Sequence, residues 1–437
     1  MMFKGIKARK ILGIFSVLLI FGGGLAGGYF YAQKINSPTK EEAFSFKENT
    51  YSPFLSEVYD KIKENYWKSL SDEELTHLFV LGIEKLVGQP QSLKKENKEE
   101  LLKTADTILK EIDSQEKKKE FVAQLADIVL ANLEPFGRSR LYSKKDETAL
   151  KNNVENKNPS VDQYEILGVL ENDSQEKIKE AYRVKEQELV VEAKTSTEAA
   201  QKLSQIENSF RVLGDEESRQ LYDTTGVEPT ITYRLLRSNI FYLYFSKISP
   251  TTFDELQRVT KKVDSGEDLD TLILDLRGNI GGSIDILPYL LGPFIGEDSY
   301  AYQFFHQGER TDFKTRVGWL PSLVRYKRVV VLIDKETQSS AEVIAATLKK
   351  YNVGVLVGVT TRGWGTIERV FKLDSQFDDK EEYSMFLVHS LTLRDDGQPI
   401  EGQGVEPTVN INNLGWENEL YKYFRCEELT EVVKELI

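Results

Sequence analysis

The sequence is poor in the side chains that bind metals or form disulfides. It has one cysteine, Cys426, which excludes an internal disulfide and a cluster of thiolate ligands. Its three histidines, His77, His306 and His389, are far apart in the sequence, and none belongs to an H-E-x-x-H pattern. We therefore expect no zinc site, and we expect neither another metal nor a cofactor.

The sequence also lacks a strongly basic block after its first ten residues. Its 57 lysine and arginine residues stand against 70 aspartate and glutamate residues, which gives a formal net charge of -13. Binding to the phosphates of a nucleic acid requires clustered cations, so we expect no nucleic-acid partner. The 437 residues, of which 40% are hydrophobic, suffice for two or three domains with cores of their own.

The longest uncharged run lies near the N-terminus, at residues 11–32 (ILGIFSVLLIFGGGLAGGYFYA). About 20 apolar residues suffice for a helix to cross a bilayer, and the basic residues before the run favour a cytoplasmic N-terminus. The pattern predicts a cytoplasmic basic tail at 1–10, one transmembrane helix at 11–32, and a single-pass cell-membrane protein whose bulk is extracytoplasmic. A cleaved signal peptide is the alternative, but the run is longer than usual and no clean A-x-A site follows it.

Composition and periodicity divide the rest of the chain into a helical part, a small all-α unit and an α/β part. Apolar residues recur at steps of three and four residues from position 51 onward, as in Phe54, Val58 and Ile62, which indicates amphipathic helices. From about residue 229, strand-like runs such as RVVVLID alternate with helical runs, which predicts a sheet covered by helices. The predicted segments are a linker at 33–50, a helical N-terminal domain at 51–142, a linker at 143–160, the small unit at 161–226 and an α/β (α+β) core at 227–437.

The small unit is predicted to be built from two main helices. Asp173 stands three residues before Glu176, the spacing of a capping box, and Gly214 follows the second helical run as a C-cap. The stretches YEILGV, IKEAYR and IENSFRVLGDEESRQLYD resemble the J-domain, a co-chaperone module. The His-Pro-Asp tripeptide with which that family engages its chaperone ATPase falls here on Val190-Val191-Glu192. The resemblance therefore implies a degenerate J-domain-like unit that keeps the fold and has lost the chaperone ATPase as a partner.

Two stretches of the core contain the groups that acyl-transfer chemistry needs. In LILDLRGNIGGSIDILPYLL (272–291) a buried strand leads into a glycine turn, whose backbone amides can hold an anion. In the stretch VVVLIDKETQSSAEVIAATLKKY, Ser339 stands at the start of a helix, where its hydroxyl is placed to attack and the next amide can stabilise an oxyanion. For either stretch alone, an ordinary glycine turn and a helix-capping serine are the alternatives.

Two more stretches, VGVTTRGWGTIE (357–368) and DGQPIEGQGVEPTV (396–409), follow in order. Together the four resemble the carboxyl-terminal processing, or tail-specific, serine peptidase family. The resemblance implies that Ser339 is the nucleophile, with Ser340 the less favoured choice, and that oxyanion amides lie near Gly281 and Ser340. The family's general base is a lysine between two glycines, and that position is Trp364 here. The glutamine that orients the lysine falls on Glu368, so Ser339 and Glu368 are the candidate catalytic residues.

Trp364 changes the chemistry that the resemblance implies. An indole nitrogen only donates hydrogen bonds, so it cannot take the proton of a serine hydroxyl. This favours a pseudopeptidase that binds polypeptide substrates or a protein partner. The alternative is a working serine endopeptidase with Glu368 or His389 as a substitute base. The family's PDZ domain, which captures substrate C-termini, is replaced by the J-like unit, so the family's substrate preference does not carry over.

Overall fold

The computed structural model describes residues 50–263, 269–394 and 396–437. Across these ranges no helix has the length and apolar character needed to cross a membrane. The longest described helices have 17 residues, fewer than the roughly 20 that a bilayer requires. This finding contradicts the transmembrane helix in the predicted fold class, and with it the predicted single-pass membrane localisation. Residues 11–32, on which that prediction was made, lie outside the described residues.

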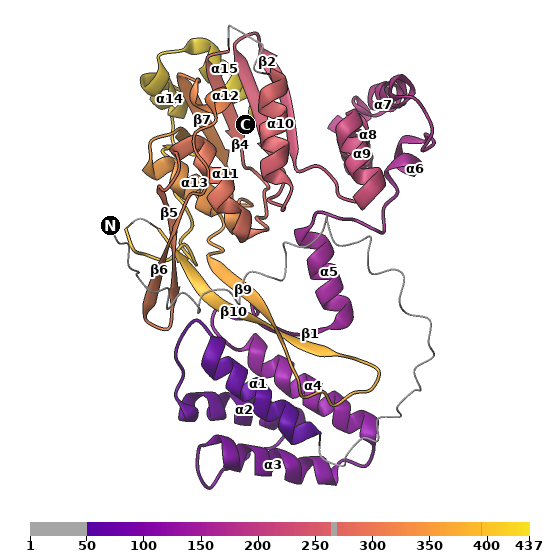
Figure 1. The fold of residues 1–437 in the computed structure, drawn as a ribbon, viewed down its shortest axis with the longest axis vertical. Helices are drawn as coiled ribbons and strands as arrows, with labels where there is room; N and C mark the ends of the chain where they lie inside the picture. The colour runs from indigo at the N-terminus through magenta and orange to yellow at the C-terminus, as the bar shows by residue number, and fades with distance from the viewer. Residues whose placement is uncertain (1–49, 264–268, 395) are drawn as a thin grey trace, which may run out of the picture. The chain divides into compact units, whose positions relative to one another are not determined.

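Four amphipathic helices begin the described part of the chain (Figure 1). Helix α2 opens with a capping box between Ser71 and Glu74, and it ends at Gly88, which has a left-handed backbone conformation. The apolar faces of the four helices share one core with sheet residues such as Met385 and Leu387. The helices are α1 (Tyr51–Asn65), α2 (Asp72–Val87), α3 (Lys98–Glu111) and α4 (Gln115–Ala131).

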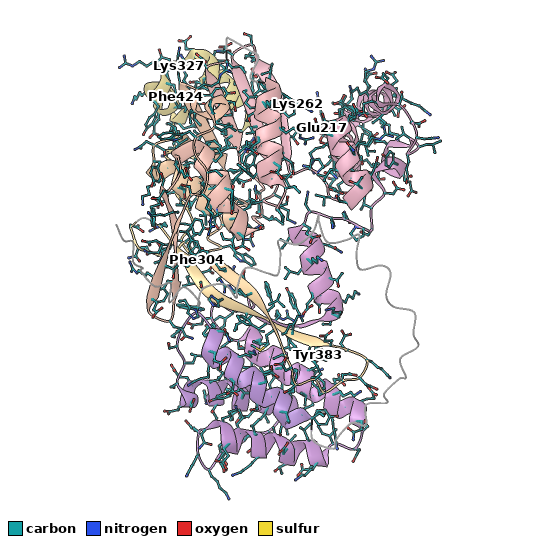
Figure 2. All side chains as sticks on the ribbon, in the orientation of Figure 1. Glu217, Lys262, Phe304, Lys327, Tyr383 and Phe424 are labelled. Carbon is teal, nitrogen blue, oxygen red and sulfur yellow. The ribbon has the colours of Figure 1, made fainter. Side chains whose placement is uncertain are left out.

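A five-stranded sheet completes this core. Strand β10 is its central strand, because it pairs with β9 along one edge and with β1 and β5 along the other, while β6 extends the sheet from β5. Tyr383, labelled in Figure 2, stacks on Phe377 with ring centroids 5.0 Å apart at the start of β10. The strands are β1 (Arg140–Ser143), β5 (Tyr300–His306), β6 (Glu309–Lys314), β9 (Thr366–Lys372) and β10 (Tyr383–Leu393).

The J-like unit is all-helical and has its own apolar core. Tyr182 stacks on Phe210 with ring centroids 4.0 Å apart, and Ile178 is fully buried beside them. Its main helix is capped by the hydroxyl of Ser174, one residue after the predicted cap Asp173. Helix α5 (Lys144–Val154) precedes the unit, which consists of α6 (Gln163–Leu167), α7 (Gln175–Leu189), the 3-10 helix η1 (Glu192–Lys194), α8 (Thr197–Leu213) and α9 (Glu216–Thr225).

A six-stranded sheet forms the centre of the core and confirms the predicted α/β architecture. The strand order is β11-β8-β7-β4-β3-β2, in which all neighbours are parallel except β2 and β3. All five residues of β4 are buried, as expected for a parallel strand covered on both faces. The strands are β2 (Ile231–Arg237), β3 (Ile240–Phe245), β4 (Thr271–Asp275), β7 (Arg328–Ile333), β8 (Val355–Gly358) and β11 (Val409–Asn410).

Helices cover both faces of this sheet (Figure 1). Leu272 and Leu274 of β4 pack with α10, α11 and α13 on one face, whereas Ile273 packs with α14 and α15 on the other. The helices are α10 (Thr252–Val263), the 3-10 helix η2 (Ile284–Ile286), α11 (Leu287–Ile295), α12 (Pro321–Val324), α13 (Ser340–Lys350), α14 (Trp416–Phe424) and α15 (Glu427–Leu436).

Candidate functional site

Three of the four sequence stretches meet at the carboxyl ends of the parallel strands. The glycine loop follows β4, Ser339 follows β7, and the segment with Trp364 follows β8. Because β4, β7 and β8 are parallel neighbours in the sheet, these loops leave the same edge. Crevices at this edge are where open α/β sheets bind their ligands. The fourth stretch joins them, since the N–H of Gly402 donates to the carbonyl of Gly363 at 2.9 Å.

Ser339 has an unusual backbone conformation at the start of α13. Its φ of 55° and ψ of -126° are rare for a residue with a side chain, and such conformations persist only where the surroundings enforce them. Ser339 is partly exposed, whereas Ser340 is 1% exposed and donates its hydroxyl to the carbonyl of Gly282 at 3.0 Å. The hydroxyl of Ser340 is therefore already engaged, and that of Ser339 is the better candidate for a nucleophile.

The glycine loop lies directly against Ser339. A Cβ atom on Gly281 would stand 2.6 Å from the Cβ atom of Ser339, and the φ of Gly281 is 84°, so both space and backbone require glycine here. The N–H of Gly281, a predicted oxyanion donor, donates to the side-chain oxygen of Asn279 at 2.8 Å. The structure thus brings the predicted serine and glycine together, with the Gly281 amide already hydrogen-bonded inside its own loop.

A buried carboxylate, which the sequence analysis did not single out, connects the serine to the tryptophan. Glu342 is fully buried, and its two oxygens accept the N–H groups of Ser339 (2.9 Å), Gly363 (2.7 Å) and Trp364 (2.8 Å). Burial raises the pKa of Glu342, although these donors and the hydroxyl of Thr361 work against the shift. The S-x-x-E spacing of Ser339 and Glu342 was the signal that could have found this residue.

Trp364 is held by one side chain over its ring and by another at its N–H edge. The guanidinium carbon of Arg138 lies 3.4 Å from the ring centroid, a cation–π arrangement. The indole N–H donates to Glu368 at 3.3 Å. Arg138 also forms an ion pair with Glu401 at 2.9 Å, and Glu401 accepts the N–H of Gly365 at 2.8 Å. The predicted pair Trp364 and Glu368 is in contact, while Arg138 and Glu401 were not predicted.

Two half-buried carboxyl groups, Glu368 and Glu401, lie near Trp364. Burial raises the pKa values of Glu368 and Glu401, and the nearby Arg138 opposes both shifts. Burial also lowers the pKa of Arg138, with Glu401 and Glu368 acting against that change. One oxygen of Glu368 additionally accepts the hydroxyl of Thr366 at 2.6 Å.

His389, the other candidate base, lies in a different environment. Its ring stacks on His306 with centroids 4.2 Å apart, and its Nδ1 pairs with the hydroxyl of Ser390 at 2.8 Å. Burial lowers the pKa of His389 to about 4, and the charges of Arg369 and His306 add to the shift. Its contacts are thus with β5, β9 and β10. Within the described ranges, no group of three or more His, Cys, Asp or Glu side chains is arranged to hold a metal.

Comparison with known proteins identifies the classes to which the two units are similar. Residues 239–411 match the model of peptidase family S41, and residues 162–223 match the model of the DnaJ domain. The α/β core is thus similar to peptidase family S41, and the J-like unit that precedes it in the chain is similar to the DnaJ domain.

Two curated relatives agree with this division. The carboxy-terminal processing protease CtpA of Bacillus subtilis is 30% identical over 190 residues, which are 43% of this chain and 38% of the relative. Chaperone protein DnaJ of Haloarcula marismortui is 44% identical over 69 residues, 16% of this chain and 18% of that protein. The solved structure of the photosystem II D1 C-terminal processing protease covers 84% of this chain and 94% of its own, with 14% identity and a TM-score of 0.48. The chain spans only 34 to 40% of the lengths of the first processing proteases it matches.

Proposed function

We propose that the S41 domain binds extended polypeptides through its Ser339 site and that its peptidase activity is severely impaired. The observation that carries this proposal is the position of Trp364, whose indole is fixed between Arg138 and Glu368. By resemblance, a base lysine belongs at that position. The strained backbone of Ser339 and the glycine loop packed against it support the proposed binding site.

The chemistry of the serine explains the expected loss of activity. A serine hydroxyl attacks only when a neighbouring base takes its proton, and the indole N–H of Trp364 is a donor that already points to Glu368. Losing one member of a nucleophile–base pair costs about 10⁴- to 10⁶-fold in rate. Glu368 accepts two hydrogen bonds on one oxygen, from Trp364 and Thr366, which makes it a poor replacement for the base.

We also propose that the J-like unit has kept the fold of its family and lost the contact with a chaperone ATPase. Val190 and Val191 occupy the place of the histidine and proline, and Val191 is 72% exposed at the end of α7. Glu192 is a longer acid than the aspartate of the family and begins the 3-10 helix η1.

We propose 51–142, 161–226 and 227–437 as the domain units of the described chain, with 143–160 as the segment between the first two.

A binding and cleavage experiment tests the proposal. The full chain is incubated with a fluorescently labelled, unstructured casein, and both the retained fluorescence and the fragments are measured. Wild type and Ser339→Ala are expected to bind the casein alike and to give the same negligible fragmentation, because Ser339→Ala removes the nucleophile without filling the site. Fragmentation by wild type that Ser339→Ala abolishes would instead establish the alternative, an active serine endopeptidase with another base such as Glu368 or His389.

A further inference from the structure

The chain enters and leaves the J-like unit through two short segments that are hydrogen-bonded to each other. We call residues 152–158 and 227–228 the stalk. Lys157 and Val227 form an antiparallel bridge, the N–H of Glu228 donates to the carbonyl of Asn156 at 2.9 Å, and the side chain of Asn156 donates to the carbonyl of Glu228 at 2.9 Å. The two ends of the unit are thus fixed together at its base.

Lys247, which follows β3, reaches into this stalk. Its ammonium group donates to the backbone carbonyl of Asn153 and, at 2.7 Å, to the side-chain oxygen of the same residue. Lys247 is only 8% exposed and lines a cavity of about 460 Å³ together with stalk residues such as Glu228 and Lys157. Burial lowers the pKa of Lys247 to about 8, and the Glu228 carboxylate opposes the shift.

The residue after Lys247 holds the glycine loop of the Ser339 site. The N–H of Ile248 donates to the carbonyl of Gly281 at 2.9 Å, and the carbonyl of Ile248 accepts the N–H of Ser283 at 2.8 Å. Gly282 lies so close that a Cβ atom there would stand 2.0 Å from the oxygen of Ile248. Because Gly281 touches Ser339, a displacement of Lys247 and Ile248 has to move the wall of the site.

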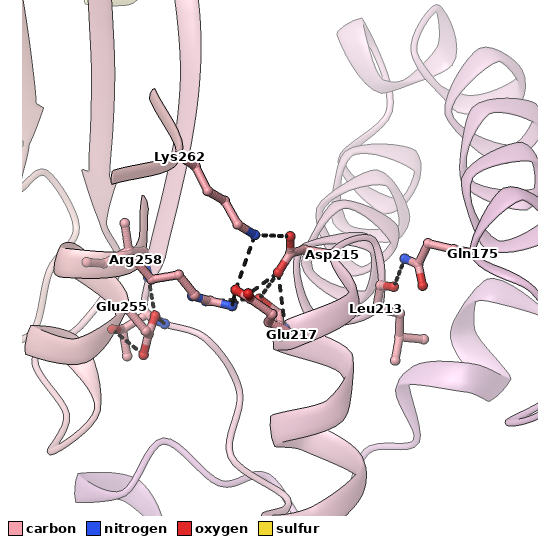
Figure 3. A network of polar contacts seen from close by, with 10 residues as sticks. Gln175, Leu213, Asp215, Glu217, Glu255, Arg258 and Lys262 are labelled. Carbon is pink, nitrogen blue, oxygen red and sulfur yellow. Dashed lines mark hydrogen bonds and ion pairs between the residues drawn. The ribbon is translucent and has the colours of Figure 1, made fainter. Parts of the chain in front are cut away.

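A second contact joins the J-like unit to the core at its other side (Figure 3). Arg258 and Lys262 of α10 form ion pairs with Asp215 and Glu217 at the start of α9, at distances of 2.8 to 3.2 Å. Lys262 and Glu217 are also labelled in Figure 2. These side chains are 25 to 55% exposed, so salt screens their attraction and each pair contributes little. The buried bonds of Lys247 are the stronger connection.

We propose that Lys247 is a positioning residue, which ties the glycine loop beside Ser339 to the stalk of the J-like unit. The attachment of the J-like unit then sets the geometry of the site through the chain Asn153–Lys247–Ile248–Gly281. The inference rests on the proposed assignment of Ser339 as the centre of the site. It gives the J-like unit a role in the molecule that needs no chaperone ATPase.

Hydrogen–deuterium exchange on the full chain tests this role. Lys247→Met keeps the length of the side chain and removes its donors, so exchange at residues 278–283 is expected to rise about tenfold, the effect of losing a hydrogen bond to a charged group. Lys262→Met is the matched control, because it removes a cation from the exposed contact with α9 and leaves the stalk intact. It is expected to leave exchange at 278–283 unchanged.

Two further measurements separate positioning from general stability. Asn153→Ala removes only one acceptor and is expected to raise exchange at 278–283 by a smaller factor, while the combined variant matches Lys247→Met alone. Exchange in α15 should stay at the wild-type level throughout. Unchanged exchange at 278–283 in Lys247→Met, or an equal rise in α15, overturns the inference. Exchange needs neither cleavage nor bound polypeptide, so its outcome is independent of whether the proposed loss of peptidase activity holds.

Discussion

The guanidinium carbon of Arg138 lies 3.4 Å from the ring centroid of Trp364, although the two residues belong to different segments of the chain. Arg138 pairs with Glu401, Glu401 accepts the N–H of Gly365, and Gly365 follows Trp364. The contacts therefore close a ring around the tryptophan. These contacts hold the indole of Trp364 in place, at the position where the resemblance leads us to expect a base.

Restoring the lysine alone should restore little activity. In Trp364→Lys, the new ammonium group would lie beside Glu368, which accepts the indole N–H of Trp364, and pairing with this carboxylate would keep the lysine charged, so it could not accept a proton from Ser339. Trp364→Lys with Glu368→Gln removes this charge and is expected to react about tenfold faster than Trp364→Lys, the effect of one unit in the pKa of the lysine. The measurement is labelling by a fluorophosphonate, with Ser339→Ala as the blank. Labelling of wild type at the level of the double variant would contradict the prediction.

Removing the cation over the indole should destabilise the fold. The side chains of Arg138 and Glu401 are 16% and 15% exposed, so Arg138→Met leaves a buried carboxylate without its partner and is expected to lower the free energy of unfolding by about 3 kcal/mol. Arg362→Met is the matched control, because Arg362 and Glu336 are 47% and 48% exposed and such a pair is worth about 0–1 kcal/mol. Urea unfolding at neutral pH measures both. Equal losses in the two variants would show that Arg138 is not part of a buried network.

The loss of folding stability at acid pH should depend on His389. Its pKa in the folded state is about 4, below the value of about 6.5 in an unfolded chain. The unfolded state therefore binds a proton first, and stability is lost as the pH falls from about 6.5 toward 4. His389→Phe keeps a ring to stack on His306 and cannot be protonated, so its unfolding free energy should fall less over this range. His77→Gln, at an exposed position, should behave as wild type. The prediction fails if His389→Phe and wild type show the same pH dependence.

Two glycines with similar φ angles should respond differently to substitution by alanine. Gly88 has a φ of 78° with nothing within 4 Å of an added Cβ atom, so Gly88→Ala should cost only the backbone term of about 1–2 kcal/mol. Gly281 has a φ of 84°, and its added Cβ atom would stand 2.6 Å from the Cβ atom of Ser339. Gly281→Ala is expected to cost about 1–3 kcal/mol more, measured by thermal or urea unfolding. Equal costs would mean that the glycine loop can move away from Ser339 freely.

The J-like unit should not stimulate a chaperone ATPase. The full chain is added at micromolar concentration to a purified chaperone ATPase, and the rate of ATP hydrolysis is expected to stay at its basal value. The reason is that Val190-Val191-Glu192 offers neither the histidine nor the aspartate of the family. A variant with Val190→His, Val191→Pro and Glu192→Asp is the matched comparison. Clear stimulation by the unmodified chain would show that the missing tripeptide is dispensable here.

The sequence predicted the parts of the site that are set by local structure. The apolar runs of β4 and β7 are buried strands, Ser339 does precede a helix, and the glycines after β4 do form a turn. Each of these depends on residues close together in the chain, so propensity and pattern suffice. The tryptophan between two glycines could be recognised for the same reason, because its neighbours in sequence mark the position.

The contacts that hold the site could not be predicted in this way. Arg138, just before β1, reaches Trp364, just before β9, because both strands pair with β10. Lys247 reaches Asn153 across the base of the J-like unit. Both are long-range pairings of ordinary charged residues, and neither has a local pattern that distinguishes it from a surface cation. The first residue of a helix is also hard to predict from the sequence. Asp173 and Ser174 are both good N-cap residues, and only the folded structure shows that Ser174 caps α7.

The bridge between Lys157 and Val227 has a consequence for how such a chain can be rearranged. Because the entry and exit of the J-like unit are adjacent, everything between them can be exchanged for another folded module, or for a short turn, without altering the distance that the surrounding chain has to span. Lys247 of the core binds Asn153, which precedes the bridge in the chain. This contact would therefore be kept if another domain were inserted after the bridge. The position is therefore suited to domain insertion, and the J-like unit is the domain inserted there in this chain.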